Sequence, residues 1–349
     1  MTPDTATPRH RKTSARVTTG LLVLVVAALL AAAYVWAARK QQPDPGPLEQ
    51  VTIATNTFYA GACAIFVAQE KGYFAAEGVL VTIQPHTSGK AALDAILQGH
   101  ANLSTSADIP IMFAVMRGQP VTIVATIFST EKDYEIVGRL DKGVTTPASL
   151  RGKRIGVTLG TSGHFVLDAF LNRQKLSPSD VTVRDLKPEA IPLALASGEI
   201  DAASTWEPYV GTMKKQAGVN GTAFAADGIY DATYNVSGTR DYVTGHPDTI
   251  KKVLRAMVSG GRFCKESPDS AREITARVMK TDAAELKESW SSYRFGIALD
   301  QSLVLALEDE TRWAIKNKLA GPGDVPNYLN NIHLDGLLAV TPGAVTVIH

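Results

Sequence analysis

The sequence predicts an α/β protein with two similarly built lobes and parallel-rich sheets, preceded by an N-terminal transmembrane helix. Three observations carry this prediction. Short β-rich runs alternate with helical stripes from Val51 onward, one pattern occurs twice, and an uncharged apolar run lies near the N-terminus. Strands that alternate with helices are typical of parallel sheets covered by helices.

The composition is that of an ordinary globular protein with room for two domains. The chain has 349 residues, 45% of them hydrophobic, with 35 Lys and Arg against 34 Asp and Glu. Because no strongly basic surface is indicated, nucleic acid is not expected as a partner.

The apolar run "GLLVLVVAALLAAAYVWAA", residues 20–38, is long enough to cross a bilayer as a helix. Residues 1–19 precede it and carry a basic bias, which keeps this tail in the cytoplasm and places the remainder outside. A signal peptide cleaved after Ala37 or Ala38 is the alternative. The basic residues of the tail are Arg9, Arg11, Lys12 and Arg16.

Residues 39–50 contain "QQPDPGPLEQ", whose prolines and glycine suit an extended spacer, so the folded part is expected to begin near Val51. Two cysteines occur, Cys63 and Cys264. An exported compartment would allow them to pair, and two separate buried thiols are the alternative.

The expected elements follow in chain order. Strands are predicted at 51–56 and 79–86, each followed by a helical stripe, and a third strand at 155–157 leads through the turn "GTSG" into a helix from about Gly163. After about Tyr242 the pattern becomes helical, with little strand signal. The longest helical patterns cover 246–264, 282–290 and 302–317.

An internal repeat suggests the two lobes. "GHANLSTSAD" (99–108) matches "GEIDAASTWE" (198–207) without a gap. Each copy follows a helical stripe, has glycine where a helix would end, and runs through a strand of small residues to an acid near a proline. Small side chains at strand ends leave space, and ligands bind in that crevice in open α/β sheets. Chance similarity among abundant small residues is the alternative.

Four segments carry a family resemblance: "IFVAQEKGYFAAEGVLV", "SADIPIMFA", "SLRGKRIGV" with "GTSGHFVLDAFL", and "LALASGEIDAASTWEPY". In this order and spacing the chain resembles the substrate-binding proteins of ABC importers for nitrate, taurine and aliphatic sulfonates. The resemblance implies a type 2 periplasmic-binding-protein fold, with the ligand trapped in a cleft between lobes. The spacing predicts lobe one at 51–127 and 235–349, and lobe two at 128–234.

The same resemblance implies an extracytoplasmic receptor, tethered by its N-terminal helix or exported after cleavage. We expect a monomer that captures a small organic anion, such as a sulfonate or a taurine-like compound, and delivers it to the permease subunits. An enzyme of the same fold acting on a small heterocycle, like the pyrimidine precursor synthases, is the alternative. The cysteine-rich motif of those enzymes is absent from the sequence.

The strand-to-helix turn "GTSGH" is the first candidate contact. Free N–H groups and the helix dipole converge at such a turn and stabilise an oxyanion, although capping alone would also explain the hydroxyl side chains. The residues concerned are Thr161, Ser162, Gly163 and His164, the last of which is equally explained by a structural role.

The repeat supplies the other candidates. Trp206 offers a flat wall for carbon, unless it belongs to the lobe core, and Glu207 and Asp108 either address the ligand or cap the following helices. Ser106 and Ala107 precede Asp108 in "SADIP", which resembles the sulfonate-binding members. The first turn adds Thr57, Phe58 and Tyr59, which either line the cleft or pack between helix and sheet.

Catalytic motifs are missing from the sequence. It contains no nucleophile elbow, no P-loop and no GxGxxG, and the seven histidines have no metal-ligand spacing. We therefore expect no enzyme activity, no cofactor and no metal.

Overall fold

The computed structural model describes residues 48–321 and 323–348. The expected cytoplasmic tail, the membrane-spanning segment at 20–38 and most of the spacer lie outside these residues. None of the helices in the described ranges combines the length and apolar character needed to span a membrane. The first strand begins at Glu49, two residues before the expected start of the folded part.

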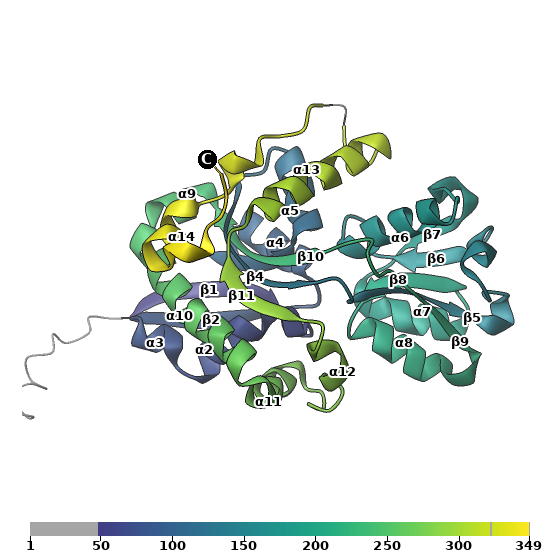
Figure 1. Cartoon of the computed structure of the whole chain (residues 1–349), viewed down its shortest axis with the longest axis horizontal. Coiled ribbons are helices and arrows are strands. Elements are labelled where there is room, and N and C mark those ends of the chain that lie inside the picture. Colours follow the sequence, from purple (N-terminus) through teal and green to yellow (C-terminus); the bar gives the residue numbers. More distant parts are fainter. Residues whose placement is uncertain (1–47, 322, 349) are drawn as a thin grey trace, which may run out of the picture. The chain divides into compact units, whose positions relative to one another are not determined.

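The first sheet has six strands in the order β11-β4-β10-β3-β1-β2 (Figure 1). Strand β1 pairs in parallel with β2 and β3, whereas β10 is antiparallel to β3 and β4, and β11 is antiparallel to β4. The strands are β1 (Glu49–Asn56), β2 (Val79–His86), β3 (Leu103–Ala107), β4 (Val121–Thr130), β10 (Ala232–Thr239) and β11 (Arg294–Ala298).

The second sheet has five strands in the order β7-β6-β8-β5-β9. Strand β6 pairs in parallel with β7 and β8, and β5 is antiparallel to β8 and β9. The strands are β5 (Tyr134–Arg139), β6 (Arg154–Val157), β7 (Thr182–Asp185), β8 (Ala202–Trp206) and β9 (Gly221–Ala225). We use first lobe and second lobe for each sheet with the helices packed on it.

Both sheets are mixed, so the expectation of parallel-rich sheets was wrong. The cause lies in the two crossings between the sheets. The chain passes from β4 in the first sheet to β5 in the second, and it comes back from β9 to β10. Strands β4 and β10 therefore run in opposite directions. The expected lobe boundaries, after Ile127 and after Tyr234, fall inside β4 and β10.

The structure bears out the internal repeat. Strands β3 and β8 each lie third in the series β2-β1-β3-β10 and β7-β6-β8-β5, with a parallel neighbour on one side and an antiparallel neighbour on the other. The aligned Gly99 and Gly198 both have positive φ, 74° and 78°. The aligned Asn102 and Asp201 each accept a backbone N–H from the neighbouring parallel strand, at 2.8 and 2.9 Å.

The helices cover both sheets. They are α2 (Cys63–Glu70), α3 (Tyr73–Ala76), α4 (Gly89–Leu97), α5 (Asp108–Met116), α6 (Ser162–Arg173), α7 (Ile191–Ser197), α8 (Tyr209–Ala217), α9 (Arg240–Gly245), α10 (Pro247–Glu266), α11 (Pro268–Met279), α12 (Lys287–Trp290), α13 (Gln301–Lys316) and α14 (Leu334–Val340).

Two expectations for the C-terminal part were incomplete. The helical pattern at 282–290 forms a turn followed by the short α12, because the Asp282 carboxylate accepts the Ala284 N–H and competes with helical hydrogen bonding. Strand β11 was not anticipated from the sequence.

Helices α2 and α10 are held together closely. A disulfide joins Cys63 to Cys264, so the two cysteines form a pair and are not separate buried thiols. A Cβ at position 260 would lie 2.1 Å from the Ala64 carbonyl oxygen, so only glycine fits where these two helices pack together.

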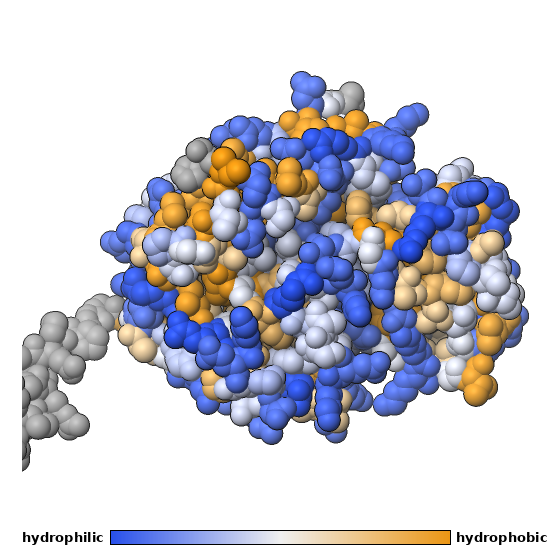
Figure 2. Space-filling view, viewed as in Figure 1, coloured by the Kyte–Doolittle hydropathy of each residue, from blue (hydrophilic) through white to orange (hydrophobic). Residues whose placement is uncertain are grey.

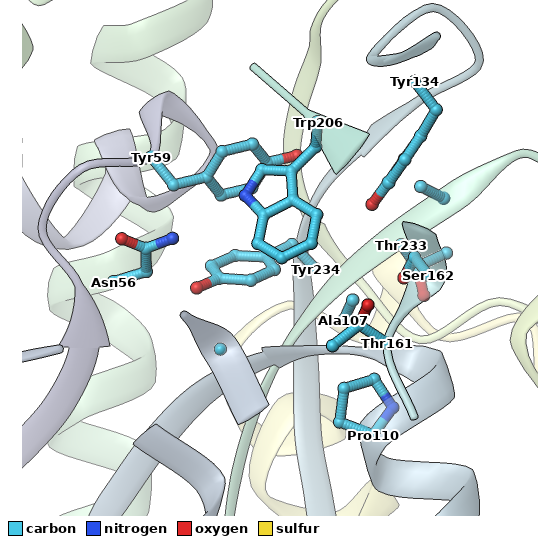
Figure 3. Close-up of a pocket in the computed structure, with 12 residues that line it drawn as sticks. Asn56, Tyr59, Ala107, Pro110, Tyr134, Thr161, Ser162, Trp206, Thr233 and Tyr234 are labelled. Atoms are coloured by element: carbon cyan, nitrogen blue, oxygen red, sulfur yellow. The ribbon is translucent and has the colours of Figure 1, made fainter. Parts of the chain in front are cut away.

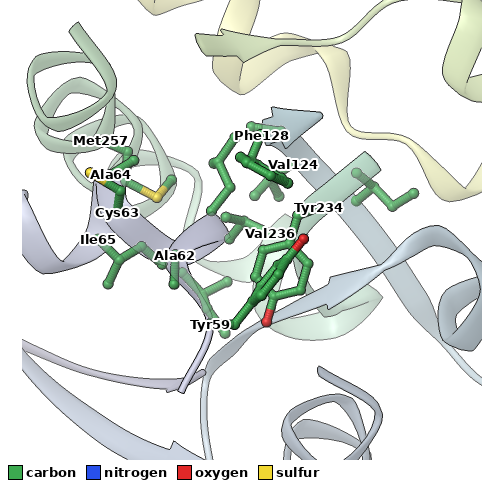
Figure 4. Packing of buried hydrophobic residues seen from close by; sticks show 14 of the residues in the cluster. Tyr59, Ala62, Cys63, Ala64, Ile65, Val124, Phe128, Tyr234, Val236 and Met257 are labelled. Atoms are coloured by element: carbon green, nitrogen blue, oxygen red, sulfur yellow. The ribbon is translucent and has the colours of Figure 1, made fainter. Parts of the chain in front are cut away.

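The main core surrounds the first sheet and extends to buried residues of the second lobe, such as Val166 and Trp206. Tyr59 packs edge to face against Phe128 and Tyr234, with ring centroids 5.7 and 5.0 Å away (Figure 4). Two smaller clusters lie on the second sheet, one with α6 and one with α7 and α8. Figure 2 shows hydrophilic side chains spread over the visible face, interrupted by hydrophobic areas, as the balanced composition suggests.

Candidate functional site

A central pocket lies between the two sheets, where the carboxyl ends of β3 and β8 meet (Figure 3). Both lobes contribute to its wall, and its free volume is only about 30 Å³, which is room for one or two water molecules. The lining residues are Asn56, Tyr59, Gly89, Ala107, Pro110, Tyr134, Thr161, Ser162, Trp206, Ala232, Thr233 and Tyr234.

The repeat explains how the pocket is assembled. Ala107 and Trp206 are the last residues of β3 and β8. Ala107 pairs with Tyr234 on the antiparallel neighbour in the first sheet, and Trp206 pairs with Tyr134 in the second. Matching strand positions in the two lobes therefore bring Trp206 and two tyrosines together.

The aromatic rings form a firm wall. Figure 3 shows the rings of Tyr59, Trp206 and Tyr234 gathered on one side of the pocket. Tyr59, Tyr134, Trp206 and Tyr234 are all at most 7% exposed, and the Tyr234 hydroxyl accepts a hydrogen bond from Thr105 at 3.1 Å. Rings fixed in this way offer apolar contact without a large loss of rotamer freedom.

Two helix N-termini point polar groups at the same pocket. Helix α4 begins at Gly89 and α6 at Ser162, one from each lobe. The N–H groups of Gly89, Ser162 and Gly163 donate to no backbone carbonyl among the described residues, as expected in the first turn of a helix. None of the lining residues is charged. The pocket therefore presents uncharged donors and positive dipole ends.

Gly89 is needed for this arrangement. A Cβ there would lie 2.9 Å from the Ser106 Cα and 3.2 Å from the Tyr234 ring. Glycine thus lets the N-terminus of α4 approach β3 and β10. The aligned hydroxyls of Ser106 and Thr205 are buried and have no hydrogen-bond partner within the described chain.

Asp108 lies behind the pocket rather than in its wall. Its Oδ1 accepts from the Ile109 N–H at 2.8 Å and from the Tyr230 hydroxyl, and its Oδ2 accepts from the Thr233 N–H at 3.1 Å and from the Thr233 Oγ1 at 2.9 Å. Thr233 lines the pocket. Asp108 therefore fixes Thr233 in the pocket wall. Burial raises the pKa of the Asp108 carboxyl, although these hydrogen bonds act to lower it.

Glu310 in α13 is a second buried carboxyl near Asp108. Burial, followed by the charge of Asp108, raises the pKa of the Glu310 carboxyl well above its usual value. Sequence reasoning missed Glu310, since it lies in an ordinary helical stripe far along the chain from Asp108.

Glu207 does not line the central pocket. Its Oε2 accepts the Gly211 N–H at 3.0 Å in the first turn of α8, and burial raises the pKa of its carboxyl. The structure separates Glu207 from Asp108, although the repeat aligns them.

The remaining predicted residues divide between pocket and core. Thr161, Ser162, Tyr59, Ala107 and Trp206 line the pocket. Gly163 packs against the Ser204 carbonyl, and His164 packs on Trp313 with its pKa lowered to about 4 by burial. Thr57 is half-buried, and Phe58 is 42% exposed in a neighbouring cleft.

Several pocket residues were not predicted. Tyr134, Thr233 and Tyr234 lie at or near the starts of β5 and β10, beside the crossings between lobes, and Asn56 ends β1. Tyr134 follows Asp133 and opens β5, yet nothing local in the sequence distinguishes it from a core tyrosine. Its pairing with Trp206 is the feature that places it in the pocket.

Comparisons with known proteins agree with this architecture. The model of the family described as NMT1/THI5 like matches residues 60–271, more than half of the chain. The taurine-binding periplasmic protein of Escherichia coli is 25% identical over 222 residues, which cover 63% of this chain and 69% of that protein.

Two further relatives are informative. The alkanesulfonate-binding protein SsuA from Xanthomonas axonopodis pv. citri, solved bound to MOPS, has a TM-score of 0.71 at 20% identity, covering 81% of this chain and 98% of that one. This similarity shows the fold. A pyrimidine phosphate synthase of Schizosaccharomyces pombe is 32% identical over 137 residues, which cover 39% of each chain. The chain belongs to the NMT1/THI5-like family and has its α/β periplasmic-binding-protein fold.

Proposed function

We propose that this chain is the extracytoplasmic solute-binding component of an ABC importer. It captures a small organic anion, such as a sulfonate or a taurine-like compound, by closure of the two lobes, and delivers it to permease subunits as a monomer. The observation that carries the proposal is the central pocket, in which the N-termini of α4 and α6 meet aromatic walls and no charged side chain.

The anionic group of the solute binds to the free N–H groups at Gly89 and Ser162, the first residues of α4 and α6 in the pocket wall. Such groups, together with the helix dipoles, stabilise an oxyanion without a lysine or arginine. The hydroxyls of Thr161 and Ser162 are further donors in the same wall. Burial favours the uncharged form of Glu310, and Asp108 accepts several hydrogen bonds, so these carboxyls repel an anion less than two bare charges would.

The carbon part of the solute packs against Trp206, Tyr59 and Tyr234. Burying apolar surface gives about 25 cal/mol per Å². This contact distinguishes an organic anion from an inorganic one, which has no carbon to place against the rings.

Closure follows from the size of the pocket. A cavity of about 30 Å³ is too small for an organic solute to enter, so the lobes must separate during binding. Hydrogen bonds join the lobes in the present arrangement, such as those from the Tyr209 hydroxyl to the Thr87 carbonyl and from the Trp313 Nε1 to Asp168, both at 3.2 Å.

The relatives support a receptor more than the enzyme alternative. Those named for taurine and alkanesulfonates cover most of this chain, whereas the synthase match covers 39% of it. The taurine-binding relative is named as a periplasmic protein, which supports an extracytoplasmic position here. The segment at 20–38 is then either a tether or a cleaved signal, which membrane fractionation and the mature N-terminus would distinguish.

A thermal-shift screen tests the function. Taurine, alkanesulfonates, nitrate, pyrimidines and small carboxylates are added to the purified protein, and every hit is analysed for products. Ligand at one hundred times its dissociation constant stabilises the folded state by about 2.7 kcal/mol. Stabilisation by sulfonates with unchanged recovery of the compound supports a receptor. Turnover, or stabilisation by pyrimidines alone, contradicts it.

A further inference from the structure

The Ser162 hydroxyl in the pocket wall is one end of a buried series of hydrogen bonds. Ser162 lines the central pocket (Figure 3), and its Oγ lies 3.1 Å from the Tyr230 hydroxyl oxygen. The Tyr230 hydroxyl in turn donates to the Oδ1 of Asp108. We call Asp108, Tyr230 and Ser162 the relay. All three residues are at most 8% exposed, so their hydrogen bonds are shielded from bulk water.

The relay joins the two lobes. Asp108 begins α5 in the first lobe and Ser162 begins α6 in the second, whereas Tyr230 lies in the crossing segment between β9 and β10. The rings of Tyr134 and Phe165 pack on the Tyr230 ring, with centroids 5.5 and 5.2 Å away. A carboxyl behind the pocket is thus connected to the pocket wall through one firmly held hydroxyl.

The number of hydrogens fixes the direction of these bonds. A tyrosine hydroxyl has a single hydrogen to donate. Because Tyr230 donates it to the Asp108 carboxylate, Ser162 must be the donor in its bond to Tyr230. The Ser162 hydroxyl then offers only lone pairs to a solute. An anion needs a donor at this position, and the proposed function uses the Ser162 hydroxyl as one.

A proton on Asp108 reverses the direction of the whole relay. The Oδ1 of Asp108 then donates to Tyr230, and the Tyr230 hydroxyl donates to Ser162, whose hydrogen becomes free for the anion. The proton comes from solvent, and only O–H bonds change. Asp108 can still accept the Ile109 N–H on Oδ1 and both Thr233 hydrogens on Oδ2, so the reversal breaks none of its other contacts.

The surroundings of Asp108 favour this proton. Glu310 is the second buried carboxyl there, and neither of its oxygens has a hydrogen-bond partner among the described residues. Burial raises the pKa of both carboxyls, and no ion pair within the described ranges includes either of them. The other titratable groups that act on this pair, or on which the pair acts, are all acids: Asp309, Tyr134, Tyr230 and Tyr328. A further negative charge is therefore unfavourable here unless a carboxyl is neutralised.

We propose that the anionic solute binds together with one proton, which Asp108 takes up and which the relay converts into a hydrogen-bond donor at Ser162. The anion then replaces the Asp108 carboxylate as the negative charge of this buried region. Tyr230 is the positioning residue, because it sets the direction of the Ser162 hydroxyl without touching the solute. This inference rests on the proposed function, which supplies the anion.

Calorimetry with ethanesulfonate tests the inference. This probe has no amine, and its sulfonate stays ionised at every pH used, so any proton exchanged belongs to the protein. Titrations at pH 7 in phosphate and in Tris, which differ in ionisation enthalpy, give the number of protons taken up. We expect about one proton per bound solute. Because the complex holds more protons than the free protein, Kd should rise between pH 5 and 8, by at most about tenfold per pH unit.

Two variants break the relay at different points. Asp108→Asn has no carboxyl to protonate, and Tyr230→Phe keeps the ring but removes the middle hydroxyl. Both should take up less than half as many protons as wild type, and their Kd should depend less on pH. Tyr230→Phe also releases the Ser162 hydrogen toward the pocket, so its affinity at pH 8 should equal or exceed that of wild type. A purely structural role of Tyr230 would only lower the affinity.

Two further variants complete the experiment. Ser162→Ala leaves Asp108 and Tyr230 intact and should flatten the pH dependence as much as Tyr230→Phe does. The double variant should flatten it no further, because both changes interrupt the same relay. The matched control is Tyr293→Phe, which removes another buried tyrosine–aspartate hydrogen bond, the one to Asp133 at 3.0 Å, outside the lining of the central pocket. It should take up as many protons as wild type.

The outcomes separate the two proposals. If ethanesulfonate binds without proton uptake, or if Tyr230→Phe takes up as many protons as wild type, the relay does not control the Ser162 hydroxyl, while the proposed function stands. If no sulfonate binds the wild-type protein at any pH, the proposed function fails, and this inference fails with it. Melting temperatures show whether each variant is folded, and Ser162→Ala decides the question if Asp108→Asn is not.

Discussion

At the scale of single residues, Trp206 gives the most direct test of the central pocket. It ends β8, lies 7% exposed in the pocket wall and stands beside Tyr134. Trp206→Ala should weaken every organic anion, because losing about 50 Å² of apolar contact costs about 1.3 kcal/mol, or roughly tenfold in Kd. Calorimetry on the variant measures this loss.

The matched control is Trp206→Phe, which retains a flat ring and should keep most of the affinity. Equal losses for the two variants would mean that the indole N–H, rather than the ring face, supplies the contact. Unchanged affinity in both would assign Trp206 to the core alone.

Asp133 gives a test based on pH. Burial, followed by the charge of Glu207, raises the pKa of its carboxyl from 3.8 to about 7. Between about pH 4 and 7 the folded protein therefore keeps a proton that the unfolded chain has released, so the free energy of unfolding falls as pH rises through this window. The fall is at most about 1.4 kcal/mol per pH unit.

Asp133→Asn should flatten this dependence and make the variant more stable than wild type above pH 7. The side-chain oxygen of the variant can still accept the Tyr293 hydroxyl hydrogen. Urea unfolding from pH 4.5 to 8 measures the effect, with the exposed Asp227→Asn as control. If the stability curves of the wild type and of Asp133→Asn run parallel over the whole range, the pKa at this site is not raised.

At the scale of elements, the contact between α2 and α10 depends on one glycine. Gly260→Ala would place a methyl group against the Ala64 carbonyl oxygen. This is a backbone atom of α2, and moving it away costs stability. We expect the free energy of unfolding to fall by about 1–3 kcal/mol, the usual cost of overpacking. Thermal or urea unfolding checks this, and Ser259→Ala, exposed and one residue earlier in the same helix, should change little. Equal stability of both variants would show that the helices move apart freely.

The disulfide also links α2 to α10 covalently. Cys63 begins α2 and Cys264 lies near the end of α10, with a sequence separation of 201 residues. Reduction, or the double change Cys63→Ala and Cys264→Ala, should destabilise the protein by about 2–5 kcal/mol. Unfolding with and without reductant measures it. A double variant as stable as wild type would mean that the helix packing alone carries this contact.

Sequence periodicity predicted the strands whose pairing partners lie nearby in the sequence. Strands β1 and β2 are apolar β-rich runs, and the repeat located β3 and β8 through matching glycines and small residues. Strand β11 was missed because its pairing with β4 joins residues far apart, and the local pattern around it is helical. The mixed direction of the sheets follows from two crossings that no local pattern records.

The same limit applies to the site. Trp206, Thr161 and Ser162 were predicted because a strand end and a helix start have local signatures. The position of Asp108 was not, since its partners Tyr230 and Thr233 lie more than one hundred residues later in the chain. Local sequence identified an acid at the right strand end, but only the tertiary structure gives the direction of its side chain.

At the scale of the whole described chain, binding should be coupled to the separation and closure of the lobes. The hydrogen bond from the Tyr209 hydroxyl to Thr87 joins α8 to the loop before α4, and the bond from Trp313 to Asp168 joins α13 to α6. These contacts exist only while the lobes are together, so they stabilise the closed form relative to an open one.

Tyr209→Phe should therefore weaken solute binding, while it keeps the ring that packs edge to face on the pocket residue Trp206 at 5.9 Å. Losing one hydrogen bond of about 0.5–1.5 kcal/mol predicts roughly a two- to tenfold loss of affinity. We expect the loss in the dissociation rate, because a less stable closed form reopens sooner. Stopped-flow measurements resolve it, and Tyr73→Phe in α3 is the control, since no hydrogen bond of its hydroxyl occurs among the described residues.

Small-angle scattering then tests the coupling itself. Wild-type protein should become more compact when a tight sulfonate saturates it, and the Tyr209→Phe variant should need a higher sulfonate concentration to reach the same compact form. The variant changes only the balance between open and closed forms, so both proteins should give the same scattering curve at saturation. Identical curves for the wild type with and without a tightly bound solute would show that the lobes do not close on it. The 3.2 Å contact of Tyr209 would then be a fixed structural bond rather than part of the binding step.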